Sequence, residues 1–360
     1  MQDQAFFHKE DTNFIKGIAI ILMVALHRLK PEWIINPELL IDISILGTPL
    51  YAILARSGDI CIGIFAFITG YGWYFSFHRK GWLGRIISLK SGIYPKYWLS
   101  LLLVCFPARL LCGYLMEGNA FTTNAKEVFF SIFAIESKSS PYCWYVSFFA
   151  LVVLTYPLLQ RSISKINIRP VNIIAVILMA SFALRVADKM FISKIPFLGS
   201  LSGVVTHYIQ WIPAIALGSL CANYSIFEKM RRWCENHIAM DPDTIGILLA
   251  VSLYISKTLI QFMSGIYTNF DCIIIIPMVY GLICLSHRIM NSLSGYVYRA
   301  ISFLGDLSFY IWMTHSILKY PLFQKIVYSV RIPILILVCS ICVTIPFSFL
   351  LKRIEQLITK

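Results

Sequence analysis

The stretch that decides the fold runs from Asn13 to His27 and reads Asn-Phe-Ile-Lys-Gly-Ile-Ala-Ile-Ile-Leu-Met-Val-Ala-Leu-His. It is the first of a series of apolar runs, each near the roughly 20 residues that a helix needs to cross a bilayer. Lys16 and His27 are eleven residues apart. That spacing is close to three helical turns, so both side chains lie on one helix face, about 16 Å apart along the axis. Ionisable residues inside a membrane helix are costly and commonly mark a functional site.

The composition extends this reading to the whole chain. Apolar residues make up 58% of the sequence and charged residues 14%, and the mean hydropathy is +0.73. A soluble domain carries about 25% charged residues. The apolar runs contain aromatics, glycines and prolines without the alternation of a barrel strand. We therefore predict an all-α polytopic integral membrane protein, with one domain over residues 1–360 and no soluble domain.

The orientation follows from the basic loops. Residues 78–97 include Arg79, Lys80, Arg85, Lys90 and Lys96 and no acidic residue, which favours the cytoplasmic side. Both termini are then cytoplasmic, and the short polar N-terminal lead leaves the first span as an uncleaved signal anchor. We predict ten spans, at about 13–28, 57–77, 98–116, 143–160, 171–187, 204–224, 244–262, 269–287, 300–320 and 332–351.

One further apolar segment is ambiguous. Residues 39–55 are long enough for a short helix but contain Asp42 and Pro49. The segment is either an amphipathic or re-entrant piece of the first outer loop or an extra span. We favour the outer loop, because an extra span would invert the topology downstream.

The net charge of +13 has a topological explanation here, because Lys and Arg collect on cytoplasmic loops. We expect no nucleic-acid partner, although part of the surplus positive charge could bind an anionic ligand such as a nucleotide.

The ten cysteines are scattered along the chain. Cys339 and Cys342 form a CxxC within an apolar run, which indicates that they pack against apolar neighbours. The sequence contains no metal-ligand spacing, no Walker A motif and no GxSxG motif, so we expect no metal.

Lys16 and His27 each have a functional and a structural interpretation. A neutral histidine can take a proton from a hydroxyl as a general base, but one at the end of a span can also simply face the headgroups. Lys16 can hold an anion or snorkel to the interface. Basic residues of 78–97 could bind phosphates, although composition alone favours a topological signal. The shared helix face links Lys16 to His27.

These residues resemble membrane acyltransferase family 3, in which a basic residue, usually Arg, is followed after ten positions by a histidine. Lys16 followed by Gly-Ile-Ala-Ile-Ile-Leu looks like the branch with sugar O-acetylases. The family's Arg-x-x-Arg falls on Leu89 and Gly92, so Arg85, Lys90 and Lys96 are donor-binding candidates by location only. Four more matches follow in order along the chain: Ile64-Phe-Ala-Phe-Ile-Thr-Gly-Tyr71, Ile93-Tyr-Pro-Lys-Tyr-Trp98, Cys143-Trp-Tyr-Val-Ser147 and Leu304-Gly-Asp-Leu-Ser-Phe-Tyr-Ile-Trp-Met-Thr-His315.

The resemblance implies an O-acyltransferase, most often an O-acetyltransferase, of the bacterial inner membrane. It would move an acyl group from cytoplasmic acyl-CoA to a sugar hydroxyl of a cell-surface polysaccharide or its lipid-linked precursor. Acetyl-CoA is the expected donor, with Lys16 at its phosphates. His27 would be the base or a transient acyl carrier, and the sequence leaves both routes open. Besides membrane lipid, the expected partners are the donor and the glycan, and self-association into a homo-oligomer stays open.

Other polar residues complete the predicted site. His315 is the second catalytic candidate after His27. Four residues are candidates for contact with the sugar, because aromatic faces stack on sugar rings and hydroxyls bond them: Trp144, Tyr145, Ser308 and Tyr310.

A competing hypothesis is a transporter or flippase for a glycan or lipid-linked sugar. It would also explain about ten spans and charges buried in the membrane. It does not require the spacing of Lys16 and His27, and the two halves of the chain show no matching pair of Gly- or Pro-broken spans.

Overall fold

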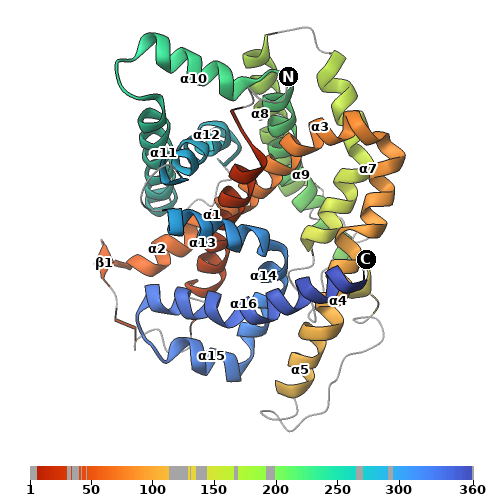
Figure 1. Cartoon of the computed structure of the whole chain (residues 1–360), viewed down its shortest axis with the longest axis vertical. Coiled ribbons are helices and arrows are strands. Elements are labelled where there is room, and N and C mark those ends of the chain that lie inside the picture. The colour runs from red at the N-terminus through yellow and green to blue at the C-terminus, as the bar shows by residue number, and fades with distance from the viewer. Residues whose placement is uncertain are drawn as a thin grey trace. The chain divides into compact units, whose positions relative to one another are not determined.

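A computed structural model of the chain is almost entirely α-helical, with one small β-hairpin (Figure 1). It describes residues 6–30, 34, 40–41, 43–45, 47–112, 129, 131–134, 144–165, 169–191, 199–264, 271–290 and 295–358.

The elements follow one another from the N-terminus with these bounds: α1 Lys9–Arg28, β1 Ser44–Ile45, β2 Thr48–Pro49, α2 Leu50–Ser57, α3 Ile60–Ser91, α4 Ile93–Ser100, a π-helical turn Leu101–Cys105, α5 Phe106–Cys112, α7 Trp144–Lys165, α8 Pro170–Met190, α9 Gly199–Asn223, α10 Ile226–His237, α11 Pro242–Ser264, α12 Asp271–Met290, α13 Gly295–Asp306, α14 Ser308–Thr314, a 3-10 turn His315–Lys319, α15 Pro321–Tyr328 and α16 Pro333–Ile358.

Seven of the described helical stretches are long and apolar enough to cross a membrane. They coincide with seven of the ten predicted spans, and the protein is therefore an all-helical, multi-pass membrane protein. The seven are Leu50–Phe77, Trp144–Ser164, Pro170–Asp188, Gly203–Asn223, Pro242–Met263, Asp271–Met290 and Pro333–Ile358. The other three predicted spans, and the cytoplasmic termini, stay predictions.

Two of those three predicted spans are not continuous α-helices. The third of the ten predicted spans, at 98–116, is made of α4, a π-helical turn and α5. Ile93–Ala108 is a shorter apolar stretch within these elements. The ninth, predicted at 300–320, breaks at Leu307 between α13 and α14 and ends in a 3-10 turn. Pro107 follows the π-helical turn and cannot donate a hydrogen bond to the carbonyl of Leu103 within it. The break at Leu307 has no proline beside it.

The structure also corrects the expected loop at 78–97. Helix α3 continues to Ser91, and α4 begins at Ile93. The Arg, Lys and Leu residues of this stretch are good helix formers, so its basic composition is compatible with a continuous helix.

The ambiguous segment 39–55 is not one spanning helix. Ser44–Ile45 pairs antiparallel with Thr48–Pro49, and Gly47 supplies the left-handed turn with a φ of 77°. Helix α2 starts directly after Pro49. The apolar stretch that contains the second predicted span therefore begins at Leu50.

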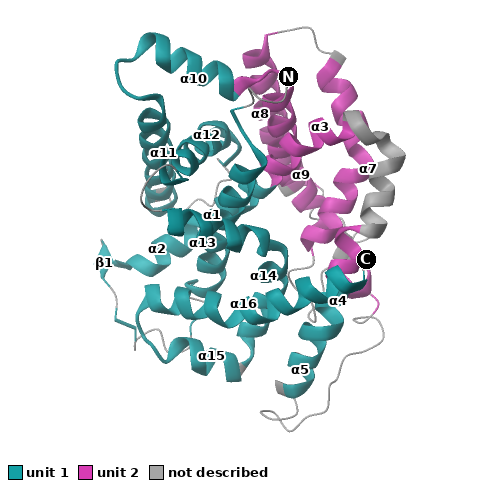
Figure 2. Cartoon of the chain, viewed as in Figure 1, with its two compact units in different colours: residues 1–65, 99–121, 227–360 teal, residues 66–98, 122–226 magenta. Residues whose placement is uncertain are grey.

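The chain divides into two compact units (Figure 2). Unit 1 comprises residues 1–65, 99–121 and 227–360, and unit 2 comprises residues 66–98 and 122–226.

In unit 1, α1 packs closely on α13 and also touches α2, α12, α14 and α16. Glycines bring the backbones of α1 and α13 together. A Cβ added at Gly17 would overlap the backbone of Ile301, and one added at Gly305 would overlap the backbone of Asn13. Small residues permit this kind of approach between membrane helices. The position of α13 on α1 is therefore fixed by backbone contact.

Unit 2 is built from α7, α8, α9 and the later part of α3. Gly70 in α3 lies against the backbone of Ile215, and Gly218 in α9 against that of Phe67. The Ser219 hydroxyl donates to the carbonyl of Gly70 at 3.0 Å. Glycine contacts and hydrogen bonds thus hold α3 and α9 together.

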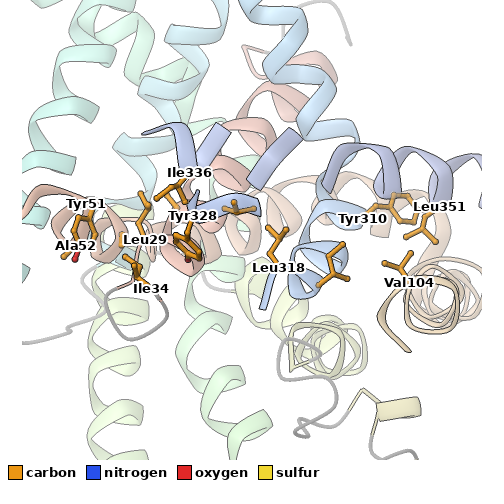
Figure 3. Close-up of a cluster of buried hydrophobic side chains, with 14 residues drawn as sticks. Leu29, Ile34, Tyr51, Ala52, Val104, Tyr310, Leu318, Tyr328, Ile336 and Leu351 are labelled. Carbon is orange, nitrogen blue, oxygen red and sulfur yellow. The ribbon is translucent and has the colours of Figure 1, made fainter. Parts of the chain in front are cut away.

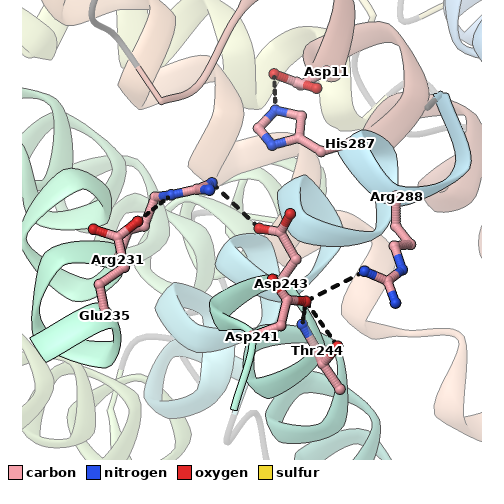
Figure 4. A network of polar contacts seen from close by, with 8 residues as sticks. All are labelled: Asp11, Arg231, Glu235, Asp241, Asp243, Thr244, His287 and Arg288. Carbon is pink, nitrogen blue, oxygen red and sulfur yellow. Dashed lines mark hydrogen bonds and ion pairs between the residues drawn. The ribbon is translucent and has the colours of Figure 1, made fainter. Parts of the chain in front are cut away.

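A polar network joins α1, α10, α11 and α12 at the end of unit 1 that holds Asp11 (Figure 4). Asp11 is buried and accepts from the Ser286 hydroxyl at 2.7 Å, with His287 Nε2 at 3.3 Å. Burial raises the pKa of the Asp11 carboxyl, but these bonds outweigh it and hold the pKa below its usual range. Arg231 of α10 bonds Glu235 at 3.0 Å and Asp243 at 3.3 Å.

The opposite end of unit 1 holds a buried ion cluster. Lys257 of α11 donates to Asp59 and lies 3.2 Å from the Asp271 carboxylate. The side chains of Lys257 and Asp271 are 2% and 0% exposed. Gln261 also donates to Asp59, at 2.9 Å. Charges so deeply buried must be paired, so this cluster ties α11 and α12 to the start of α3.

We predict that Gly17→Ala destabilises the protein by about 1–3 kcal/mol, the usual cost of overpacking. The added methyl must push α13 away from α1. Gly72→Ala is the matched control, because no described atom lies within 4 Å of a Cβ there. Its stability should be unchanged or raised by up to about 1 kcal/mol through helix propensity. Thermal unfolding of both variants in detergent compares them, and equal midpoints would contradict the close packing.

We also predict that Lys257→Ala costs about 3–5 kcal/mol, because it leaves the buried Asp271 carboxylate without its cation. The double variant Lys257→Met with Asp271→Leu should recover much of this loss, since the two most deeply buried charges are removed together and only Asp59, whose side chain is 23% exposed, stays. Lys325→Ala, at an exposed lysine of α15, serves as the control. A Lys257→Ala midpoint equal to that of this control would show that the cluster does not stabilise the fold.

Candidate functional site

Two histidines from opposite ends of the chain meet in unit 1. His27 lies in the last turn of α1, and His315 follows the last residue of α14. Their ring centroids are 5.0 Å apart, and the ring planes are inclined by 32°. The structure therefore brings together the first and second catalytic candidates of the sequence.

The His315 ring has a defined orientation. Its side chain is fully buried, and its Nδ1–H donates to the carbonyl oxygen of Trp312. Because a carbonyl only accepts, the proton of the neutral ring is on Nδ1 and the lone pair is on Nε2. His315 is thus fixed by its own helix end, and His27, which is half-buried, is the more accessible of the two.

Residues close in sequence to both histidines belong to one cluster of buried apolar side chains, which Figure 3 shows. Ala25 and Leu29 flank His27, and Ile317 and Leu318 follow His315. The Tyr328 hydroxyl of α15 donates to the Arg28 carbonyl at 2.8 Å, which satisfies a backbone group at the end of α1. His27 itself is half-buried within this packing.

Positive charge gathers at the histidine pair. Arg28 is 1% exposed, and Arg28, Lys30 and Lys319 all act electrostatically on the His27 imidazole. Arg28 and Lys319 act on His315 as well. The sequence reasoning missed these three cations. Their closeness in sequence to the histidines could have indicated them. Arg28 and Lys30 follow His27, and Lys319 ends the turn that begins at His315.

A thiol contacts residues that flank His315 in the chain. The Sγ atom of Cys105, in the π-helical turn, lies 3.8 Å from the Met313 carbonyl oxygen and 3.7 Å from the Ser316 hydroxyl. Cys105 and His315 are both buried. The π-helical turn thus packs directly against the segment that carries His315.

Lys16 lies on the same continuous helix as His27, because α1 spans Lys9–Arg28 without interruption. The predicted shared face and axial separation of about 16 Å follow from regular helix geometry. Lys16 is half-buried, next to the backbone contact of Gly17 with Ile301.

The other donor-binding candidates belong to unit 2. Arg85 and Lys90 lie on the later part of α3, and their side chains are outside the described part of the structure. Lys96 lies in α4 and is half-buried. Their proposed contact with the donor stays a prediction.

Two sugar-contact candidates lie at the start of α7 in unit 2. The Trp144 ring stacks on the imidazole of His207 in α9, with centroids 4.1 Å apart and planes at 27°. Tyr145 packs against Phe148, with centroids 5.5 Å apart. One face of Trp144 is therefore covered, and only the other face could stack on a sugar.

The remaining two candidates, Ser308 and Tyr310, are buried in α14. The Tyr310 hydroxyl donates to the Glu355 carboxylate of α16. This bond gives Tyr310 a part in joining α14 to α16. Sugar contact by either residue stays a prediction.

No curated protein and no solved structure matches this chain. A family model described as an acyltransferase domain matches residues 10–353. The match includes the helices that carry Lys16, His27 and His315, and it covers nearly the whole chain, so the protein belongs to this family of membrane acyltransferases.

Proposed function

We propose that the protein is a membrane O-acyltransferase that moves an acetyl group from acetyl-CoA to a sugar hydroxyl. The acceptor is a cell-surface polysaccharide or its lipid-linked precursor, and the enzyme acts in the bacterial inner membrane. The observation that carries the proposal is the meeting of His27 with His315 in a family of acyltransferases. The Lys16–His27 spacing on one helix supports it.

The chemistry requires a base at the hydroxyl. In the direct route, His27 takes the hydroxyl proton as the oxygen attacks the thioester carbonyl. A C–O bond forms, the C–S bond breaks, and the imidazolium returns the proton to the departing CoA sulfur. In the second route the His27 imidazole attacks first and carries the acetyl group until the hydroxyl displaces it. Both routes need the same accessible ring nitrogen.

His315 has a positioning role in this proposal. Its Nδ1–H is held by the Trp312 carbonyl, and its ring packs against that of His27. Groups whose orientation is set before the substrate arrives need no reorganisation during the reaction. The buried His315 therefore orients the half-buried His27 toward the hydroxyl.

Lys16 supplies the donor end of the site. Acetyl-CoA is polyanionic and is made in the cytosol, so its phosphates need a cation on the cytoplasmic side. In the predicted orientation Lys16 lies near that side, and His27 lies about 16 Å further along the same face of α1. The flexible arm of the donor can then present its thioester to His27.

We predict that His27→Ala abolishes acetyl transfer. Membranes that contain wild-type or variant protein receive labelled acetyl-CoA, and label is counted in the extracted glycan. His237→Ala, at an exposed histidine of α10, should keep wild-type activity. His27→Gln, which keeps a polar side chain of similar size, should also be inactive while its unfolding midpoint stays near that of the wild type. Transfer by folded His27→Gln at the wild-type rate would exclude His27 from catalysis.

We predict that Lys16→Ala raises the KM for acetyl-CoA about tenfold with a smaller effect on kcat, because it removes a ground-state contact to the donor. Lys16→Arg should keep most activity, since it keeps the charge. Lys325→Ala is the charge-matched control. Unchanged KM values in purified Lys16→Ala would place the donor phosphates elsewhere.

A further inference from the structure

Three exposed isoleucines lie on the segment that leads into and includes β1 (Figure 1). Ile41, Ile43 and Ile45 are 67%, 69% and 45% exposed, and together they are called the isoleucine face below. The hairpin ladder reaches Ile43, whose carbonyl accepts from the Leu50 N–H at 2.8 Å. Alternate residues of a strand point to the same face, so Ile43 and Ile45 point one way and Ser44, between them, points the other.

Hydrogen bonds hold this segment at the end of unit 1 where His27 lies. The Ile41 N–H donates to the carbonyl of Arg331 at 3.0 Å. Arg331 follows α15, whose Tyr328 hydroxyl donates to the Arg28 carbonyl at 2.8 Å. Because Arg28 is next to His27 at the end of α1, the isoleucine face is connected to the catalytic end of that helix.

The isoleucine face also adjoins a surface that lies in the bilayer. Ile332 and Ile334 directly follow Arg331 and its bond to Ile41, and they are 38% and 61% exposed. Ile334 belongs to α16, one of the helices that can cross a membrane. Ile255, within the span of α11, is 51% exposed. The isoleucine face is thus as exposed as the residues of the spans that face lipid.

The bilayer fits this face better than a second copy of the chain does. An exposed apolar patch marks a contact with a membrane or with protein, and a second copy could pair with the hairpin edge. Each strand has only two residues, and the Ile41 N–H is already bonded. A short edge of this kind is a weak template for another strand. Arg331 is exposed beside the face, and a cation next to apolar side chains suits phosphate headgroups.

We propose that the hairpin is an interfacial membrane element whose isoleucine face inserts among lipid chains beside the start of α16. Open strand edges do not face lipid within the hydrocarbon core, where no water can bond the backbone. The hairpin backbone therefore lies in the headgroup layer, and only the isoleucine side chains reach the lipid chains. This contact holds the His27 end of α1 at the membrane surface. The inference goes beyond the proposed function and does not depend on which reaction the protein catalyses.

Photo-crosslinking of the full chain in proteoliposomes of phosphatidylcholine tests the proposal. The photoreactive residue p-benzoyl-L-phenylalanine replaces Ile43, Ile45, Ser44 or Ile255 in separate variants, and part of the phosphatidylcholine carries tritium in its fatty acyl chains. Irradiation should label the Ile43 and Ile45 variants as strongly as the Ile255 variant, whose altered position is exposed within a span. The Ser44 variant is the matched control on the other side of the strand, and it should take up far less label.

Thermal midpoints in detergent should stay near that of the wild type for all four variants, because the positions are exposed. The Ile45 variant repeats the test if the Ile43 variant unfolds. Labelling of both isoleucine variants no higher than that of the Ser44 variant overturns the proposal, because the face then lies in water. A crosslinked dimer in place of lipid label also overturns it, since a second copy of the chain would then cover the face.

Discussion

The contact between the backbones of α1 and α13 is the constraint on which the rest of the site depends. Gly17 and Gly305 let the two helices touch without intervening side chains, so α13 has little freedom to slide along α1. Helix α14 follows after a break at Leu307, and its end carries His315. The 5.0 Å separation of the two imidazole rings is thus the outcome of a helix contact near the other end of α1. Dispersion forces and small residues, rather than a hydrophobic driving force, hold such helices together in lipid.

Much of this arrangement could be predicted from the chain. Apolar runs of span length predict seven helices that the structure also has, because a membrane helix must satisfy its backbone hydrogen bonds internally. The spacing of Lys16 and His27 predicts a shared face because α1 is regular. The choice of His315 rested on a family motif, and no periodicity linked it to His27. Their contact depends on the tertiary packing of α13 and α14 on α1.

The features that the sequence-based predictions missed or got wrong have identifiable physical causes. The stretch 78–91 is rich in charge but also in good helix formers, so α3 continues through it where a loop was expected. The interruptions at Leu101–Cys105 and Leu307 involve apolar residues that look like uninterrupted helix in a hydropathy profile. Lys257 was missed because a single lysine in an apolar run gives no indication of its acidic partners. Asp59 and Asp271 are distant from it in sequence and meet it only in the folded protein.

The glycine contacts also bear on how this enzyme can diversify. Where side chains interlock, a larger residue on one helix can be compensated by a smaller one on its neighbour. At Gly17 and Gly305 the neighbour is main chain, which has no smaller substitute, so these positions can accumulate little variation. Positions where side chain packs on side chain are under no such restriction. Variation among relatives should therefore concentrate away from the α1–α13 contact, so that the relative placement of the two histidines is inherited intact.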